Sequence, residues 1–274
     1  MLSRTLRTSP QCCRCYSPAT RASSPHPALA YLPNFLTLPE QSPLLRHSLR
    51  LLDSPSRTTA AARRLRREWH KANPSWKAEE NGFMADEAYA WEEGHFDGVI
   101  SKYREMLVRE GAWGEEGEKG KLKSVLDKVY SLLPAVPSPS TSLAPLTPAP
   151  PTSPPSHLVM HLLHLSSRGA IFPHVDNVEA FGQTIVGVSL GGERVMRFKQ
   201  VSEPGEGMVK DGPKEFEVLV ESGSAYIQSE PLRTHYTHEV LETAEWNSKT
   251  VGGSQRLSIM LRDRLPSDAS SVQV

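Results

Sequence analysis

The chain has 274 residues, of which 31 are basic and 31 acidic, and its formal net charge is zero. Its 38% hydrophobic content suits one good-sized domain or two small ones. No apolar run approaches the roughly 18 to 20 residues that a membrane-spanning helix needs. The 23 prolines exceed what a compact domain requires, so part of the chain is expected to be linker.

Residues 1–30 have the composition of a mitochondrial import sequence, with many Ser and Thr and no acidic residue before Glu40. A flexible basic tail is the alternative. The segment holds all the cysteines, so its removal would leave a mature protein without a thiol. Removal would also leave 27 basic against 31 acidic residues, since 31 less four arginines is 27. A net charge near −4 disfavours a general nucleic-acid binder. The arginines are Arg4, Arg7, Arg14 and Arg21, and the cysteines are Cys12, Cys13 and Cys15.

Residues 31–133 are expected to form a helical support region. The chain begins extended after Leu32 and then spaces its leucines as a helix does up to Asp53. Residues 96–110 and 120–133 show similar apolar spacing and are also predicted to be helices. Before these two segments, the basic stretch AARRLRREWHK at residues 61–71 is interpreted as a solvated helix face, with a phosphate contact to RNA as the alternative. Its arginines are Arg63, Arg64, Arg66 and Arg67.

Residues 134–157 are expected to form an exposed proline-rich loop. Nine prolines lie between Pro134 and Pro155, among Ser, Thr and Ala. Such a segment cannot bury a core, and it favours extended polyproline-like backbone.

Residues 158–265 show short β-type runs separated by turns, followed by a flexible tail at 266–274. Because no helix separates these runs, they predict a mainly β fold, a jelly roll, braced by the N-terminal helices. The runs are HLVMHLLHL, QTIVGVSL, RVMRFKQV, EFEVLVE, GSAYIQ, YTHEVL and QRLSIMLR.

His174 and Asp176 are two positions apart, so in a strand they project from the same face. With one later histidine, either His235 or His238, they would complete a two-His-one-carboxylate metal site. A His-x-Asp pair alone is more often structural than ligating.

Arg256 and Arg262 share a face of the last β run with Ser258 and Met260. Two arginines facing a barrel interior require anions, which a dicarboxylate would supply. They stand about 20 Å apart in an extended strand, so they would serve different ends of a site. The alternative is that one or both face solvent at the strand ends.

His-x-Asp, a distant His and Arg-x5-Arg in this order resemble the Fe(II)/2-oxoglutarate dioxygenases of the AlkB group. The stretches SSRGAIFPHVDNVEAFGQTIVGVSL, YTHEVL and RLSIMLR resemble its mitochondrial AlkB homologue 7 branch, over residues 158–263. The resemblance implies a double-stranded β-helix. It assigns Fe(II) to His174, Asp176 and His238, and the cosubstrate 2-oxoglutarate to Arg256, Arg262 and Tyr226.

The resemblance has one departure. Nucleic-acid demethylases of the group carry Asn-x-Tyr eleven residues before the first metal-binding histidine, and Leu163 and Leu165 stand there in this chain. No lid for gripping an extruded base is evident either. The chain therefore resembles the homologue 7 branch more than the DNA-repair members.

The resemblance implies a dioxygenase of the mitochondrion, with the matrix expected, that uses O2 to oxidise a C–H bond. The expected substrate is a protein or another non-DNA molecule, with links to energy and fatty acid metabolism and to regulated necrosis. A mitochondrial tRNA demethylase and a non-catalytic jelly-roll binding module are the alternatives.

Overall fold

The computed structural model describes residues 24–56, 58–94, 98–133, 154–176, 182, 184–201 and 212–263. The predicted C-terminal tail, most of the predicted import segment and most of the proline-rich loop lie outside these residues. Among the helices described, none has the length and hydropathy to cross a bilayer.

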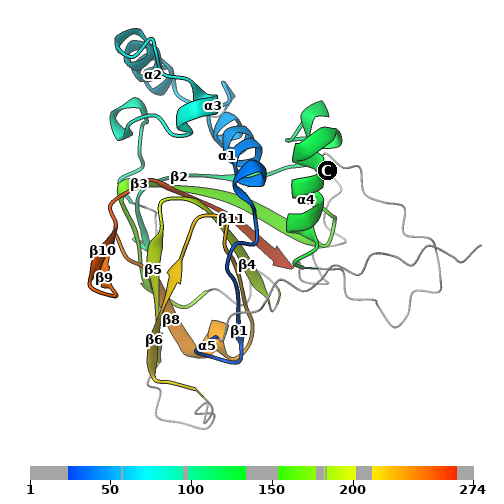
Figure 1. The fold of residues 1–274 in the computed structure, drawn as a ribbon, viewed down its shortest axis with the longest axis vertical. Helices are drawn as coiled ribbons and strands as arrows, with labels where there is room; N and C mark the ends of the chain where they lie inside the picture. The colour runs from blue at the N-terminus through cyan, green and yellow to red at the C-terminus, as the bar shows by residue number, and fades with distance from the viewer. Residues whose placement is uncertain are drawn as a thin grey trace, which may run out of the picture.

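A curled antiparallel sheet forms the body of the molecule (Figure 1). In the described chain this sheet has nine strands: eight follow the order β1-β7-β4-β11-β3-β8-β5-β6, and the ninth, β2, pairs with β3 off this path. A separate hairpin, β9 and β10, lies at one side. The strands of the main sheet are β1 Leu29–Leu32, β2 Ile100–Val108, β3 Leu158–His174, β4 Ile185–Gly191, β5 Arg194–Gln200, β6 Glu215–Val220, β7 Ala225–Gln228, β8 Tyr236–Val240 and β11 Arg256–Asp263. The hairpin strands are β9 Thr243–Trp246 and β10 Lys249–Gly252.

The curled sheet has two layers, one containing β11 and the other containing β8. The 17-residue strand β3 belongs to both layers. Its residues 158–165 pair with β11, whereas Ile171 and His174 pair with β8. The sheet therefore folds over on itself, which confirms the predicted mainly β jelly roll. The C-terminal end of β3 reaches the second layer, and the His-x-Asp pair lies there.

Helices cover the outer face of the first layer, as the sequence predicts (Figure 1). Helix α1 begins with a capping box, in which the Thr37 backbone N–H donates to the Glu40 carboxylate at 2.8 Å. The helices are α1 Leu38–Leu52, α2 Ala60–Ala72, α3 Ala78–Asn81, α4 Gly120–Tyr130 and α5 Leu232–His235, with 3₁₀ turns η1 Asp86–Ala88 and η2 Glu115–Glu118.

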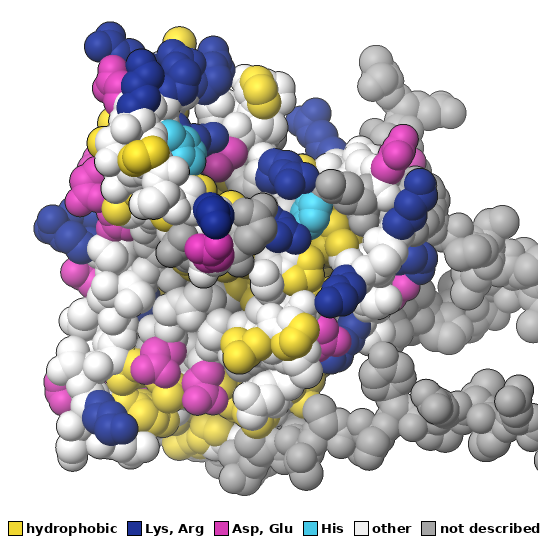
Figure 2. Space-filling model, turned by 45° about the horizontal axis from the view of Figure 1, so that its top comes forward, with side chains coloured by type: hydrophobic (Ala, Val, Ile, Leu, Met, Phe, Trp, Pro, Cys, Tyr) yellow, Lys and Arg dark blue, Asp and Glu magenta, His cyan; other side chains and the backbone are white. Residues whose placement is uncertain are grey.

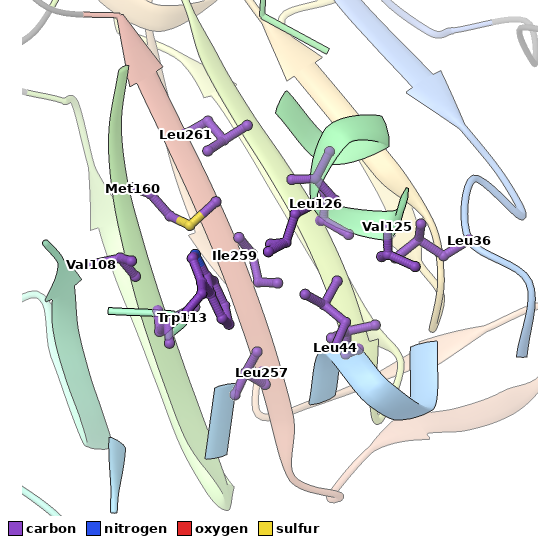
Figure 3. Packing of buried hydrophobic residues seen from close by; sticks show 14 of the residues in the cluster. Leu36, Leu44, Val108, Trp113, Val125, Leu126, Met160, Leu257, Ile259 and Leu261 are labelled. Carbon is purple, nitrogen blue, oxygen red and sulfur yellow. The ribbon is translucent and has the colours of Figure 1, made fainter. Parts of the chain in front are cut away.

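Strand β11 separates the apolar core from the barrel interior. Leu257, Ile259 and Leu261 are each 0% exposed and point toward Leu44 of α1 and Leu126 of α4 (Figure 3). Burial of each such side chain contributes about 1.5–3 kcal/mol. The alternate residues of β11 face the other way, into the barrel, as predicted.

The helix predicted over residues 96–110 is wrong, because residues 100–108 form strand β2. A bulge at Lys102, whose φ is 49°, shifts the register between Ser101 and Tyr103. The bulge breaks strict alternation, so the apolar residues fall at a spacing that mimics a helix. Met106 is buried in the core, whereas Leu107 is 40% exposed.

Candidate metal centre

His174 and His238 lie directly opposite each other on β3 and β8, with ring centroids 4.2 Å apart. The His174 Nε2 atom lies 4.0 Å from Asp176 Oδ1, and the His238 Nε2 atom lies 3.7 Å from Asp176 Oδ2. One potential ligand atom from each residue falls within 4.8 Å of the others. The structure thus brings together three of the predicted site residues.

His235 does not join this group. It ends α5, is exposed, and its Nδ1 atom lies 2.8 Å from the Thr234 hydroxyl. Of the two histidines that the spacing left open, His238 is the one in the cluster.

Both histidines turn Nε2 toward Asp176. The His174 Nδ1 atom lies 2.9 Å from the Phe172 carbonyl oxygen, so Nδ1–H donates and Nε2 carries the lone pair. Burial lowers the pKa of His238 to about 4, although Asp176 opposes the shift. His238 is therefore a neutral imidazole at neutral pH, as metal binding requires.

The buried atoms of the cluster fit a divalent cation. Asp176 Oδ2 is buried and has no hydrogen-bond partner among the described residues. A carboxylate oxygen is costly to bury unless a cation or donor meets it. Two imidazoles and one carboxylate are the ligand set of open-sided Fe(II) sites.

Arg256 lies deep in the same barrel and is 1% exposed. Its Nε–H donates to the Ser189 hydroxyl at 2.9 Å, and the Tyr226 hydroxyl is a further hydrogen-bond partner. The Arg256 Nη2 and Ser258 Oγ atoms are buried without a hydrogen-bond partner in the described chain. Two such donors side by side fit the distal carboxylate of 2-oxoglutarate.

Tyr226 reaches Arg256 from the neighbouring strand β7, where it pairs with Gly187 of β4. Burial raises the pKa of Tyr226, so its hydroxyl stays protonated at neutral pH and can donate.

Arg262 lies at the other end of β11, with Nη2 3.7 Å from Asp176 Oδ1. The two arginines lie at opposite ends of β11, and Arg262 is the one beside Asp176. Burial is the main cause that lowers the pKa of Arg262, and Asp176 raises it.

Leu163 and Leu165 pair with Ser258 and Arg256 across the β3–β11 ladder and face the barrel interior. By the sequence resemblance, these are the positions where nucleic-acid demethylases of the AlkB group carry Asn-x-Tyr. In this chain that wall is apolar, so the polar contacts of the pocket come from β4, β7 and β11.

Three polar residues of the barrel escaped the sequence reasoning. Ser189 lies opposite Ser258 on the neighbouring strand β4. Its place in the barrel can be predicted only when the register of β4 and β11 is known. Gln228 follows Tyr226 by two positions on β7 and is 2% exposed. Arg233, on α5, is 1% exposed and has no periodic signal, because a single turn of helix sets its direction.

The arginine-rich segment at residues 61–71 lies on α2, which contributes no buried residue. Figure 2 shows basic side chains gathered over this end of the molecule, interspersed with acidic ones. The predicted helix is confirmed.

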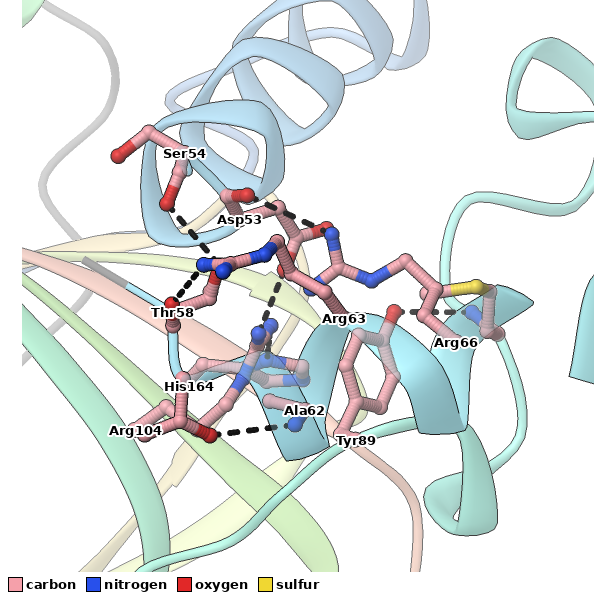
Figure 4. Close-up of polar contacts among 11 residues, drawn as sticks. Asp53, Ser54, Thr58, Ala62, Arg63, Arg66, Tyr89, Arg104 and His164 are labelled. Atoms are coloured by element: carbon pink, nitrogen blue, oxygen red, sulfur yellow. Dashed lines mark hydrogen bonds and ion pairs between the residues drawn. The ribbon is translucent and has the colours of Figure 1, made fainter. Parts of the chain in front are cut away.

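Two of the four arginines of this stripe hold α2 in place. Arg66 lies 2.5 Å from the Asp53 carboxylate, which also binds Arg104 of β2 at 2.6 Å (Figure 4). Arg63 donates to the backbone carbonyls of Pro55 and Thr58. Because Arg63 and Arg66 make these contacts within the protein, fewer arginines of residues 61–71 are available to bind an RNA phosphate backbone than the sequence alone indicates.

A family model described as the 2OG-Fe(II) oxygenase superfamily matches residues 28–262. The chain is 35% identical over 105 residues to the mitochondrial alpha-ketoglutarate-dependent dioxygenase alkB homolog 7 of Bos taurus, and equally to that of Mus musculus. Each match covers 38% of this chain and 44% of the relative, so the chain spans less than half the length of these relatives.

Solved structures with a similar chain path include OsALKBH1, with a TM-score of 0.43 and 16% identity over 87% of this chain and 99% of that one. A prolyl-4-hydroxylase from Pseudomonas putida gives a TM-score of 0.39 and 12% identity over 86% of this chain and 92% of that one.

Proposed function

The chain belongs to the 2OG-Fe(II) oxygenase superfamily, and we propose that it is an Fe(II)- and 2-oxoglutarate-dependent dioxygenase of the AlkB homologue 7 type. One observation carries the proposal. The cluster of His174, Asp176 and His238 shares a barrel with the buried, incompletely paired guanidinium of Arg256.

His174, Asp176 and His238 would hold the metal, and Arg256, Tyr226 and Arg262 would hold 2-oxoglutarate. Bound Fe(II), together with 2-oxoglutarate and O2, supplies oxidation of a substrate C–H bond coupled to release of succinate and CO2.

The chain's own part is binding, orientation and the exclusion of water. The guanidinium of Arg256 and the hydroxyl of Tyr226 fix the distal end of the cosubstrate. Arg262 orients the carboxylate of Asp176. Leu163 and Leu165 belong to the buried apolar cluster beside Arg256 and Ser258, so their side chains would keep water from the cosubstrate.

A protein or another non-DNA substrate is favoured over RNA. Arg63 and Arg66 are engaged in holding α2, and Leu163 and Leu165 replace the polar pair of the demethylases. The relatives are named mitochondrial, which supports the same compartment, with the matrix favoured. We also propose the domain boundaries predicted from the sequence. The same proposal includes a role linked to energy and fatty acid metabolism and to regulated necrosis.

The test is succinate release by the full chain supplied with Fe(II), 2-oxoglutarate and O2, with and without mitochondrial extract. We expect succinate from the wild type and from Glu217→Gln, a surface control on β6, and none from Asp176→Ala. Iron binding without succinate under every condition would support the non-catalytic binding module instead.

A further inference from the structure

A cavity of about 630 Å³ lies between α1 and the start of α4. Figure 1 shows the two helices side by side on the outer face of the sheet, where Lys128 of α4 pairs with Glu40 of α1 at 3.1 Å. Leu122 of α4 packs in the same apolar core as Leu257 of β11, whereas Arg256 of β11 faces the barrel interior. The sheet therefore separates this cavity from the metal centre. Its volume is typical of small-molecule sites, which span about 300 to 1,000 Å³.

Three cationic side chains line this cavity. Arg46 comes from α1, and Lys119 and Lys121 come from the start of α4. In the described part of the chain, none of the three has an ion-pair partner. The first turn of α4 has no acidic residue that could balance the lysines. Glu115 is the one carboxylate of the described lining, so three cations less one carboxylate leave a formal charge of +2, with His47 counted as neutral.

Another part of the lining is apolar. Pro39 and Pro43 of α1 and Leu122 of α4 form it. Leu122 is 4% exposed and belongs to the core, so packing fixes its position. Proline rings are rigid and have no backbone N–H, so this wall supplies contact area and no hydrogen-bond donor from the prolines. A hydrated inorganic ion gains nothing from such a wall, whereas a ligand with an apolar group can bury that group against it.

We propose that this cavity binds a small molecule that carries a phosphate monoester on an apolar body. A phosphate monoester has a charge of about −2 at neutral pH, which matches the formal charge of the described lining. The guanidinium of Arg46 can donate two parallel hydrogen bonds to phosphate oxygens, and the ammonium groups of Lys119 and Lys121 add point charges. The proposed site lies outside the barrel, so it is distinct from the sites for metal and 2-oxoglutarate.

The experiment is a calorimetric titration of the full chain, at low ionic strength, with phenyl phosphate, inorganic phosphate and phenol. We expect saturable binding of phenyl phosphate, weaker binding of inorganic phosphate and no binding of phenol. Arg46→Gln should weaken phenyl phosphate by at least about tenfold, because it removes charged hydrogen bonds. Lys121→Gln should weaken it by about threefold. Glu115→Gln should strengthen it by about twofold, since it removes a charge of the same sign as the ligand.

Lys123→Gln is the matched control. It removes the same charge from the same helix as Lys121→Gln, but Lys123 pairs with Asp127 and does not line the cavity. It should change the affinity by less than about twofold. Arg256→Gln should bind phenyl phosphate as the wild type does, because Arg256 lies across the sheet.

Several results would overturn the proposed site. They are a wild type that does not bind phenyl phosphate, equal affinity for phenyl phosphate and inorganic phosphate, and an affinity that Arg46→Gln and Lys121→Gln leave unchanged. Equal losses in Lys121→Gln and Lys123→Gln would show only a general charge effect, and a loss in Arg256→Gln would place the ligand in the barrel. Binding of oligouridylate through Arg46, without binding of phenyl phosphate, would assign the cavity to RNA instead. None of these measurements requires iron or 2-oxoglutarate, so failure here would leave the proposed oxygenase function intact.

Discussion

Tyr226 reaches Arg256 because residue 187 has no side chain. A Cβ atom built on Gly187 would lie 2.2 Å from Tyr226 Cζ and 2.4 Å from its hydroxyl oxygen. The aromatic ring thus crosses the neighbouring strand directly over the glycine backbone. Close approach of this kind is a common reason for glycine inside a strand.

Gly187→Ala should displace Tyr226 and weaken 2-oxoglutarate binding by about tenfold, the value of one good hydrogen bond to a charged group. Metal affinity should change less, because Tyr226 is not one of the residues of the metal cluster. Gly94→Ala is the control, since its added Cβ would meet nothing closer than 4.0 Å. Calorimetry of both variants checks this, and equal 2-oxoglutarate affinity in the two would contradict the positioning of Tyr226 by Gly187.

The residues of the site divide into those that sequence spacing predicts and those that it does not. The two-residue period of strands predicts that Arg256 and Arg262 share a face. It predicts the same for His174 and Asp176, but β3 ends at His174, and their assignment to a metal site came from the resemblance to the AlkB group. Arg233 cannot be found in this way. It enters the barrel through one turn of helix, and the direction of that turn depends on the tertiary fold.

At the scale of elements, Asp53 links α2 to the barrel. Its carboxylate joins Arg66 of α2 to Arg104 of β2, and Arg104 lies 2.9 Å from Nδ1 of the buried His164 (Figure 4). Arg104 also stacks over the Tyr89 ring at 4.2 Å. Since α2 has no buried residue of its own, this network is a major part of what fixes it.

Asp53→Asn should destabilise the protein by about 2–4 kcal/mol, because it leaves two largely buried guanidinium groups facing each other. Limited proteolysis should then cut within or beside α2 before the barrel unfolds. Glu68→Gln, which removes the exposed partner of Arg64, should change neither measurement. Urea denaturation gives the free energies, and equal stability of the two variants would show that the network does not hold α2.

Strand β2 shows why element type is harder to predict than the barrel itself. The few apolar residues of β2 fit the spacing of a bulged strand and that of a helix. The segment forms a strand because β3 supplies backbone hydrogen-bond partners along its length. The strand predictions over β4, β5 and β6 are confirmed, although only β6 alternates in burial, because β4 is buried on both faces.

At the scale of the whole molecule, several histidines are buried in the neutral form. Burial lowers the pKa of His26, His161, His164 and His238, to about 4 for His161 and His238. In the unfolded chain a histidine titrates near 6.5, so below that pH the unfolded state binds more protons than the folded state. Stability is therefore lost as the pH falls below about 6.5.

The metal-free protein should lose stability between pH 7 and pH 5.5, by up to about 1.4 kcal/mol per pH unit for each such histidine. His161→Gln should reduce this pH dependence, whereas His70→Gln, an exposed change on α2, should not. Urea denaturation at the two pH values measures the effect. A free energy of unfolding that is equal at both would contradict neutral burial of these histidines.

The central claim is that His174, Asp176 and His238 form the iron site. Its most direct test is an anaerobic Fe(II) titration of the wild type, His238→Ala and His235→Ala. We expect one Fe(II) per chain in the wild type and in His235→Ala. His238→Ala should lose more than about 100-fold in affinity, because loss of a hydrogen-bond partner of a ligand alone costs about 10- to 100-fold. Full Fe(II) binding by His238→Ala, with loss in His235→Ala, would contradict the account.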